Sequence, residues 1–322
     1  MTPLTTTQNR LDHFQHEALF YEGPEGFLDV IVPFVRDGIE AGEPVFVVVD
    51  AEKIDLLRER LDGHAREVRF ADMASVGVNP ARIIPAWREF VAEHQDSGRP
   101  LRGVGEPIWP GRSPAELVEC HLHEALLNVE FDQGPPWWLI CPYDTTALDP
   151  AVVEESRRTH PSVVSDGGRE RGAFPGSRTV TVLDGPLPEP AGPVQELEIG
   201  PGSLFGVRRF VSQRAHDAGL GFDRIAGLVL AVNEVATNSL RYGGGAGTLR
   251  IWEEPGALLV EISDEGRIRE PLVGRQAPRR DEPGGWGLWI ANQLCDLVQI
   301  RSSEGTATVR MHLRLGDPFS GS

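Results

Sequence analysis

The stretch LAVNEVATNSLRYG, residues 230–243, decides how the second half of the chain is interpreted. Apolar residues in and just before it recur at helical spacing, which predicts a helix over 222–241 with one buried stripe. Glu234 and Asn238 lie one turn apart on another face of that helix. A carboxylate beside a carboxamide can hold a hydrated Mg²⁺, which prefers oxygen ligands and bridges phosphates. Taken alone, the pair is more typical of a solvated helix face, so the segments that follow decide its meaning.

Outward from this helix, the next polar motif lies at the end of a predicted strand. Residues 257–263 (ALLVEIS) are apolar and lead into Asp264, and the permissive Gly266 follows. An aspartate in this place can accept a hydrogen bond from an exocyclic amine such as that of adenine. Thr306, in the last predicted hairpin, is expected to support this aspartate.

Two glycines open a further helix, which is expected near 286–297. Gly285 and Gly287 allow backbone N–H groups to approach phosphates, and the N-terminus of a helix favours their negative charge. Each motif is weak alone, but the order and spacing of all of them together are specific.

At this point the segment 195–315 resembles the GHKL (Bergerat-fold) ATPases, specifically the Rsb-type anti-sigma-factor serine/threonine kinases. The matching motifs are Glu234-x-x-x-Asn238, Asp264-x-Gly266, Gly285-x-Gly287 and Gly305-Thr306. The resemblance implies ATP and Mg²⁺ as cofactors and an α+β sandwich, with helices on one face of a mainly antiparallel sheet. One departure is Ile268, which stands where the family usually has a second glycine.

The resemblance also implies a role for each motif residue. Asn238 would ligate Mg²⁺ and Glu234 would be the general base. Asp264 would read adenine, while Gly285 and Gly287 would hold the phosphates. Gly266 and Thr306 would complete the nucleotide site, and the Arg-rich loop over 265–284 would cover it as a lid.

Partners follow from the family as well. A kinase domain of this type binds a sigma factor and phosphorylates a serine or threonine of an anti-sigma-factor antagonist. Two other interpretations stay open. One is a histidine kinase that works with a response regulator, with His123 as phosphoacceptor, and the other is a non-catalytic module whose nucleotide only orders the lid. Whether the chain is a monomer or a homodimer is left open.

The first half of the chain alternates short apolar strands with helices. VFVVV at 45–49 and WWLI at 137–140 are continuously apolar, as in parallel strands covered on both faces. This βαβ pattern predicts a three-layer α/β domain. Four short motifs carry a further resemblance: HEALFY at 16–21, GEP at 105–107, HLHE at 121–124 and CPYD at 141–144. With these motifs, residues 14–163 resemble the MEDS (methanogen/methylotroph sensory) domain, which is related to RecA-like ATPases.

A small-molecule site is expected at the carboxyl ends of these strands. The candidate lining residues are Glu106, Trp109, Tyr143 and Asp144. ATP hydrolysis in this domain is not expected, because the loop over 21–27 has the glycines of a phosphate-binding loop without its lysine or threonine.

A metal site at Cys120, His121 and His123 is disfavoured. His121 and His123 point about 160° apart on a helix, so one ion does not readily bind both.

The sequence also predicts the domain boundaries and the cellular location of the protein. A sensory domain is expected over 1–165, a Gly/Pro-rich linker over 166–194 and the ATPase domain over 195–316. The net charge of −17 argues against direct binding to nucleic acid. The polar N-terminus has no apolar signal-peptide core, and no window reaches the length of a membrane span, so we expect a cytoplasmic protein without a membrane partner.

Overall fold

The computed structural model describes residues 12–165, 167–176, 183–278, 285–303 and 305–316. The chain forms two compact units, Met1–Val180 and Thr181–Ser322. Each unit has its own sheet and its own hydrophobic core. The division between them falls inside the segment that the sequence predicts to be a linker.

The first unit is built on a seven-stranded sheet. Its strands are β1 (Gln15–Tyr21), β2 (Val45–Val49), β3 (Val68–Asp72), β4 (Leu101–Gly105), β5 (Trp137–Asp144), β6 (Ser162–Ser165) and β7 (Gly168–Arg171). The strand order is β3-β2-β4-β5-β1-β6-β7. Neighbouring strands are parallel except β6 and β7, which pair antiparallel at one edge.

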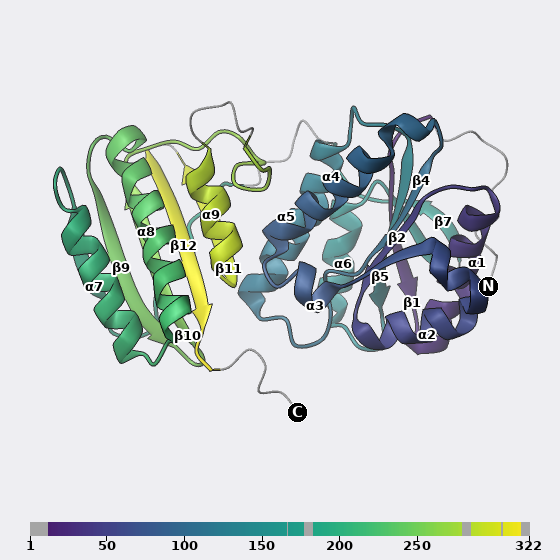
Figure 1. The fold of residues 1–322 in the computed structure, drawn as a ribbon, viewed down its shortest axis with the longest axis horizontal. Coiled ribbons are helices and arrows are strands. Elements are labelled where there is room, and N and C mark those ends of the chain that lie inside the picture. The colour runs from purple at the N-terminus through teal and green to yellow at the C-terminus, as the bar shows by residue number, and fades with distance from the viewer. Residues whose placement is uncertain (1–11, 166, 177–182, 279–284, 304, 317–322) are drawn as a thin grey trace. The chain divides into compact units, whose positions relative to one another are not determined.

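Helices cover both faces of this sheet, as Figure 1 shows. They are α1 (Gly23–Glu40), α2 (Ala51–Leu61), α3 (Met73–Val76), α4 (Ile83–His94), α5 (Pro114–Glu130) and α6 (Pro150–Thr159), with the short 3₁₀ helices η1 (Asp62–Glu67), η2 (Pro80–Arg82) and η3 (Gln95–Ser97). α1 and α2 pack together on one side, and α4, α5 and α6 pack on the other. The predicted three-layer α/β architecture is therefore present.

The sheet continues beyond the predicted end of the first domain at residue 165. β7 lies in the part of the chain predicted to be linker, because its sequence GRER has no apolar alternation to mark a strand. Its side chains are mostly exposed at the sheet edge, where a strand needs backbone pairing more than burial.

The second unit has a five-stranded antiparallel sheet, and its helices lie on one face of it (Figure 1). Its elements are β8 (Gln195–Ile199), α7 (Leu204–Asp217), α8 (Phe222–Tyr242), β9 (Gly247–Glu254), β10 (Ala257–Asp264), α9 (Trp286–Leu294), β11 (Leu297–Ser303) and β12 (Thr306–Arg314). The strand order is β11-β12-β10-β9-β8. α8 packs between α7 and α9, and its apolar stripe is buried against the sheet.

Part of the predicted linker packs on this second sheet. The carbonyl of Leu183 accepts a hydrogen bond from Ser302 N at 2.8 Å, and that of Pro188 accepts one from Arg310 at 2.9 Å. Leu183 and Leu187 are both buried. Residues 183–190 therefore pack on the fold of the second unit, whereas the sequence-based division assigns them to the Gly/Pro-rich linker over 166–194.

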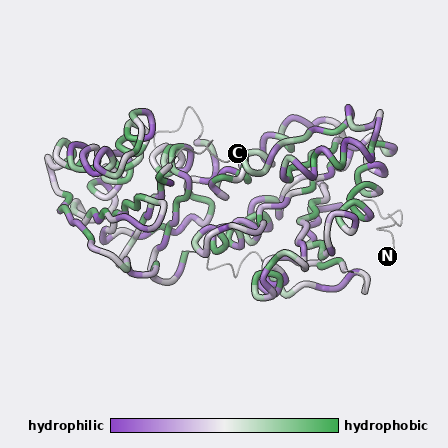
Figure 2. The backbone as a smooth tube through the Cα atoms, turned by 90° about the horizontal axis from the view of Figure 1, so that it is seen from below, coloured by the Kyte–Doolittle hydropathy of each residue, from purple (hydrophilic) through white to green (hydrophobic). Residues whose placement is uncertain are grey.

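Hydrophobic and hydrophilic residues alternate along the helices of both units in Figure 2. This is the pattern of helices that bury one face and expose the other. Within the described residues, no helix is long and apolar enough to cross a membrane.

Candidate functional site

α8 carries the first two candidate residues of the second unit. Val235 and Ser239 on its buried face fix the rotation of the helix against the sheet. As a result, Asn238 lines a cavity of about 390 Å³. Glu234 lies one turn earlier on the same face and is partly exposed. The predicted juxtaposition of these two side chains is present.

Asp264 stands across the same cavity, at the end of β10. Its Oδ1 accepts a hydrogen bond from Gly266 N at 2.7 Å, which holds the carboxylate at the turn after the strand. The end of α8 approaches this carboxylate very closely. A Cβ at Gly243 would lie 2.3 Å from Asp264 Cγ, so a side chain at residue 243 would displace the aspartate.

The start of α9 closes the cavity on the side of Asn238. Gly285 caps the helix with a φ of 80°, in the left-handed region that favours glycine. A Cβ at Gly287 would lie 2.9 Å from Asn238 Nδ2 and 3.4 Å from Glu234 Cβ. The positive end of α9 thus lies against the Glu234–Asn238 pair, where phosphates are stabilised by a helix N-terminus.

The rest of the wall combines apolar and charged side chains. The apolar lining residues are Val235, Ile268, Val273, Leu288, Ala307 and Val309. Arg267 and Arg269 line the same cavity from the predicted lid. Residues 279–284 of that lid lie outside the described residues. Glu270 lines the cavity as well, so Asp264 is one of two carboxylates in its wall. Apolar walls beside a carboxylate fit a planar base, and the two arginines fit phosphates.

Ile268 stands where the family usually has a glycine, and it is held in place without backbone strain. Its backbone N donates to Ser302 Oγ at 2.9 Å, and its side chain packs against the core. Among the described non-glycine residues, the only positive φ is at Asp62. Isoleucine therefore needs no glycine-like backbone conformation at this turn.

Thr306 is not brought to the cavity. The alternation of β12 turns Ala307, the pairing partner of Asp264, toward the helices, and Thr306 and Thr308 toward the opposite face of the sheet. Thr306 is exposed and lines a different cavity. The expectation that its hydroxyl supports Asp264 is wrong for this structure, because the strand period places the pair on opposite faces.

In the first unit, Glu106 is buried at the carboxyl end of β4 with two polar partners. Its Oε1 accepts from Tyr21 Oη at 2.7 Å, and its Oε2 lies 2.8 Å from Lys53 Nζ. Burial raises the pKa of Glu106 to about 7, against the opposing effect of the Lys53 charge and of both hydrogen bonds. The pKa of Tyr21 is raised too, chiefly by burial and then by the charge of Glu106.

Lys53, the single lysine of the sequence, was missed as a candidate. It comes from α2 and also pairs with Asp50 at 2.9 Å. Burial alone would lower the pKa of Lys53, but the carboxylates of Glu106 and Asp50 raise it. The sequence could have indicated this residue, because its one lysine follows the carboxyl end of β2, and the carboxyl ends of parallel strands meet at one edge of the sheet.

The β1–α1 connection is much shorter than a phosphate-binding loop. α1 begins at Gly23 after the single residue Glu22, and Gly23 N already donates to Asp144 Oδ1 at 3.3 Å. Hydrogen bonds hold the pKa of Asp144 below its usual range although burial acts to raise it. This geometry agrees with the absence of the phosphate-loop lysine and threonine from this stretch.

Two of the four predicted sensory residues, Tyr143 and Asp144, lie on opposite faces of the first sheet. Tyr143 is fully buried on the other face of β5 from Asp144, with its ring edge-on to His160. Trp109 stacks on the guanidinium of Arg112, 3.6 Å from its ring centroid. Strand alternation explains why Tyr143 and Asp144 lie apart, because successive residues of β5 point to opposite helix layers.

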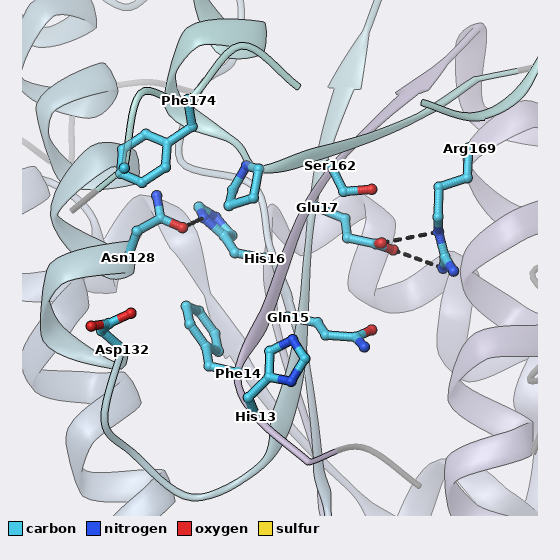
Figure 3. Close-up of a pocket in the computed structure, with 12 residues that line it drawn as sticks. His13, Phe14, Gln15, His16, Glu17, Asn128, Asp132, Ser162, Arg169 and Phe174 are labelled. Atoms are coloured by element: carbon cyan, nitrogen blue, oxygen red, sulfur yellow. Dashed lines mark hydrogen bonds and ion pairs between the residues drawn. The ribbon is translucent and has the colours of Figure 1, made fainter. Parts of the chain in front are cut away.

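A cavity of about 630 Å³ lies at the opposite end of β1 (Figure 3). Its wall includes Phe14, His16, Asn128 and Phe174, and the Glu17–Arg169 ion pair closes one side. The cavity therefore lies at the amino end of β1, whereas the sequence-based expectation placed the site at the carboxyl ends of the strands.

Comparisons with known proteins match the two structural units to two different family models. Residues 15–161 match the family model of the MEDS domain, described as the methanogen/methylotroph, DcmR sensory domain. Residues 199–313 match that of the histidine kinase-like ATPase domain. No curated protein matches the chain.

Among solved structures, the chain is similar to the RsbU and RsbW domains of a Mycobacterium tuberculosis protein. The two are 18% identical with a TM-score of 0.31, and the match covers 39% of this chain and 34% of the other. The matched part is thus about a third of the length of that solved chain. The chain therefore contains a region that matches the MEDS sensory domain, followed by a region that matches the histidine kinase-like ATPase domain.

Proposed function

We propose that the chain is an anti-sigma-factor regulatory protein, a sensor-controlled kinase of the Rsb type. Its second domain binds ATP with Mg²⁺ and transfers the γ-phosphate to a serine or threonine of an anti-sigma-factor antagonist. The same domain sequesters a sigma factor. The first domain supplies the sensory input, and its mainly parallel sheet, with β1 between β5 and β6, is interpreted as RecA-like without a working phosphate loop.

The observation that supports this proposal most is the cavity of the second domain. Asn238 of α8 and Asp264 at the end of β10 both line it, and the N-terminus of α9 packs on the Glu234–Asn238 pair. Asn238 would hold the metal, and Glu234 would accept the proton of the attacking hydroxyl. Bound Mg²⁺ would neutralise charge on the transferred phosphate.

ATP binding to the full chain provides the first test. Asp264→Asn should weaken ATP·Mg binding at least tenfold, measured by calorimetry, because the amide presents a donor where adenine offers an amine. The neighbouring Glu265→Gln is the matched control, since Glu265 is exposed and does not line the cavity. Wild-type chain that binds no ATP, or equal affinities for Asp264→Asn and wild type, would overturn the assignment.

The acceptor separates this proposal from a histidine kinase. Phosphoserine and phosphothreonine survive acid, whereas phosphohistidine is hydrolysed by it. His123 is only 1% exposed on α5, so a γ-phosphate cannot reach it without local opening. Acid-stable label on the antagonist is expected. Acid-labile label that His123→Ala removes would favour the histidine kinase, and no transfer at all would favour a non-catalytic module.

A further inference from the structure

Four buried side chains of the first domain converge on one point, although they are far apart in the sequence. They are His16 on β1, Glu124 on α5, Cys141 on β5 and His160 directly after α6. One potential ligand atom from each lies within 4.8 Å of all the others. None of them belongs to the metal arrangement considered from the sequence, which involved neighbouring positions on α5 instead.

The distances within this cluster are close to those of a metal ligand set. His16 Nε2 lies 3.0 Å from Glu124 Oε2 and 3.3 Å from Cys141 Sγ. Cys141 Sγ and His160 Nε2 each lie 3.3 Å from the same glutamate oxygen. A tetrahedral ion with bonds of about 2.0–2.3 Å separates its ligand atoms by roughly 3.3–3.8 Å.

Hydrogen bonds outside the cluster set the tautomer of His16. The side-chain amide of Asn128 donates to the carbonyls of Thr159 at 2.8 Å and Glu124 at 3.1 Å. Its Oδ1 is therefore the atom that faces His16 Nδ1 at 3.1 Å, and it can only accept. His16 thus carries its proton on Nδ1 and directs the Nε2 lone pair into the cluster.

His160 is oriented in the same way. Its Nδ1 lies 2.8 Å from the carbonyl of Ser156, which can only accept a hydrogen bond. His160 Nε2 is fully buried, and its 3.3 Å contact with Glu124 Oε2 does not have the alignment of a hydrogen bond. Two buried imidazole lone pairs thus face one buried carboxylate oxygen, which is unfavourable unless a cation or an extra proton lies between them.

We propose that His16, Glu124, Cys141 and His160 together bind one Zn²⁺ ion. Two imidazole nitrogens, one thiolate and one carboxylate oxygen are ligands that zinc accepts in tetrahedral sites. The Cys141 thiol loses its proton to solvent when the Zn–S bond forms. The thiolate and the carboxylate then balance the double charge of the ion, so the buried centre is neutral.

Such a site would tie together four elements of the sensory domain. Carbonyl and carboxamide groups that orient metal-binding histidines are typical of zinc proteins. His16 and Asn128 also line the 630 Å³ cavity, as Figure 3 shows. The hydrogen bond that orients His16 therefore forms part of the cavity wall.

The test uses the full chain, purified without chelators or a polyhistidine tag. Mass spectrometry of the metal content should find about one zinc per chain. After zinc is exchanged for Co²⁺, a thiolate-to-cobalt charge-transfer band should appear, and Cys141→Ser should abolish it. Cys120→Ser is the matched control, because Cys120 is equally buried and donates to the carbonyl of Pro107 instead.

Measurements on the wild type and on several variants each test the zinc site. His160→Gln should reduce zinc content at least tenfold in chains that remain folded. Folded wild-type chain that holds neither zinc nor cobalt would overturn the site, and so would an undiminished band in Cys141→Ser. If the substituted chains do not fold, zinc content and the cobalt band of the wild type give the answer. Neither depends on ATP binding by the second domain.

Discussion

Glu234 and Asn238 sit one helical turn apart, yet the proposed chemistry gives them different roles. Glu234→Ala should keep ATP binding and lower phosphoryl transfer about 10²–10⁴-fold, since a positioned base contributes that much. Asn238→Ala should weaken both, because it removes a metal contact. Transfer to the cognate antagonist and ATP binding are measured on the same preparations. Unchanged transfer by Glu234→Ala would remove this residue from the catalytic role.

A second residue-scale prediction concerns Glu106 and the pH dependence of stability. Its pKa is raised from 4.5 to about 7 in the folded chain, chiefly by burial. Stability from the protonated carboxyl is therefore present below the unfolded pKa and is lost as pH rises through 7. Between pH 4.5 and 8 the wild type should lose up to roughly 3 kcal/mol relative to Glu106→Gln.

The measurement is urea unfolding of both proteins across this pH range. Glu52→Gln on the exposed side of α2 is the control and should show the wild-type pH profile. If the difference between Glu106→Gln and wild type does not change with pH, the carboxyl is ionised throughout and the Lys53 pairing outweighs burial.

At the scale of elements, the segment 183–190 is expected to stabilise the second domain. Leu183 and Leu187 are buried, and Pro188 accepts a hydrogen bond from Arg310. A fragment that starts at residue 191 should be about 3–5 kcal/mol less stable than one that starts at 181, from the loss of two buried leucines and one hydrogen bond.

Chemical denaturation of the two fragments measures this difference. Leu187→Ala in the longer fragment should give an intermediate loss, because only part of the buried surface is removed. Equal midpoints for both fragments would mean that the segment adds no stability to the sheet.

The helices and strands also show which elements could be predicted from the sequence. Long periodic helices such as α8 and apolar strands such as β2 were predicted within a few residues, because burial of one face imposes a period on the sequence. The strands β7 and β8 were missed, since most of their side chains are exposed: β7 has no apolar period, and β8 has only Leu197 and Ile199 to mark one. Edge strands depend on backbone pairing, which leaves little trace in residue type.

The site was predictable where its residues share one element. Glu234 and Asn238 could be placed together because helical geometry alone determines their spacing. Thr306 could not, because its face depends on the register of β12 against β10. Lys53 and Glu106 meet only through the order of strands in the sheet, which a single sequence does not specify.

At the scale of the whole molecule, two separate cores predict two unfolding transitions. ATP·Mg at one hundred times its dissociation constant should stabilise the second domain by about 2.7 kcal/mol. That corresponds to a rise of roughly 8 °C in one transition. The other transition should not move.

Calorimetry of the full chain measures this, and the fragments 12–180 and 181–322 identify which transition belongs to which domain. Asp264→Asn should remove the shift. A single transition that moves as a whole with ATP would mean that the two domains unfold as one cooperative unit.

The sequence contains one lysine, and its amine is held between Asp50 and Glu106 with only 18% of the side chain exposed. Within this sequence, Lys53 is therefore the one side chain that amine-reactive labels can acylate, and it is a slowly reacting group at one end of the first sheet. Mass spectrometry of acylated protein can follow that one group as a reporter, with no engineered probe. Its labelling rate should rise whenever the Lys53–Glu106 contact opens, whatever molecule causes the opening.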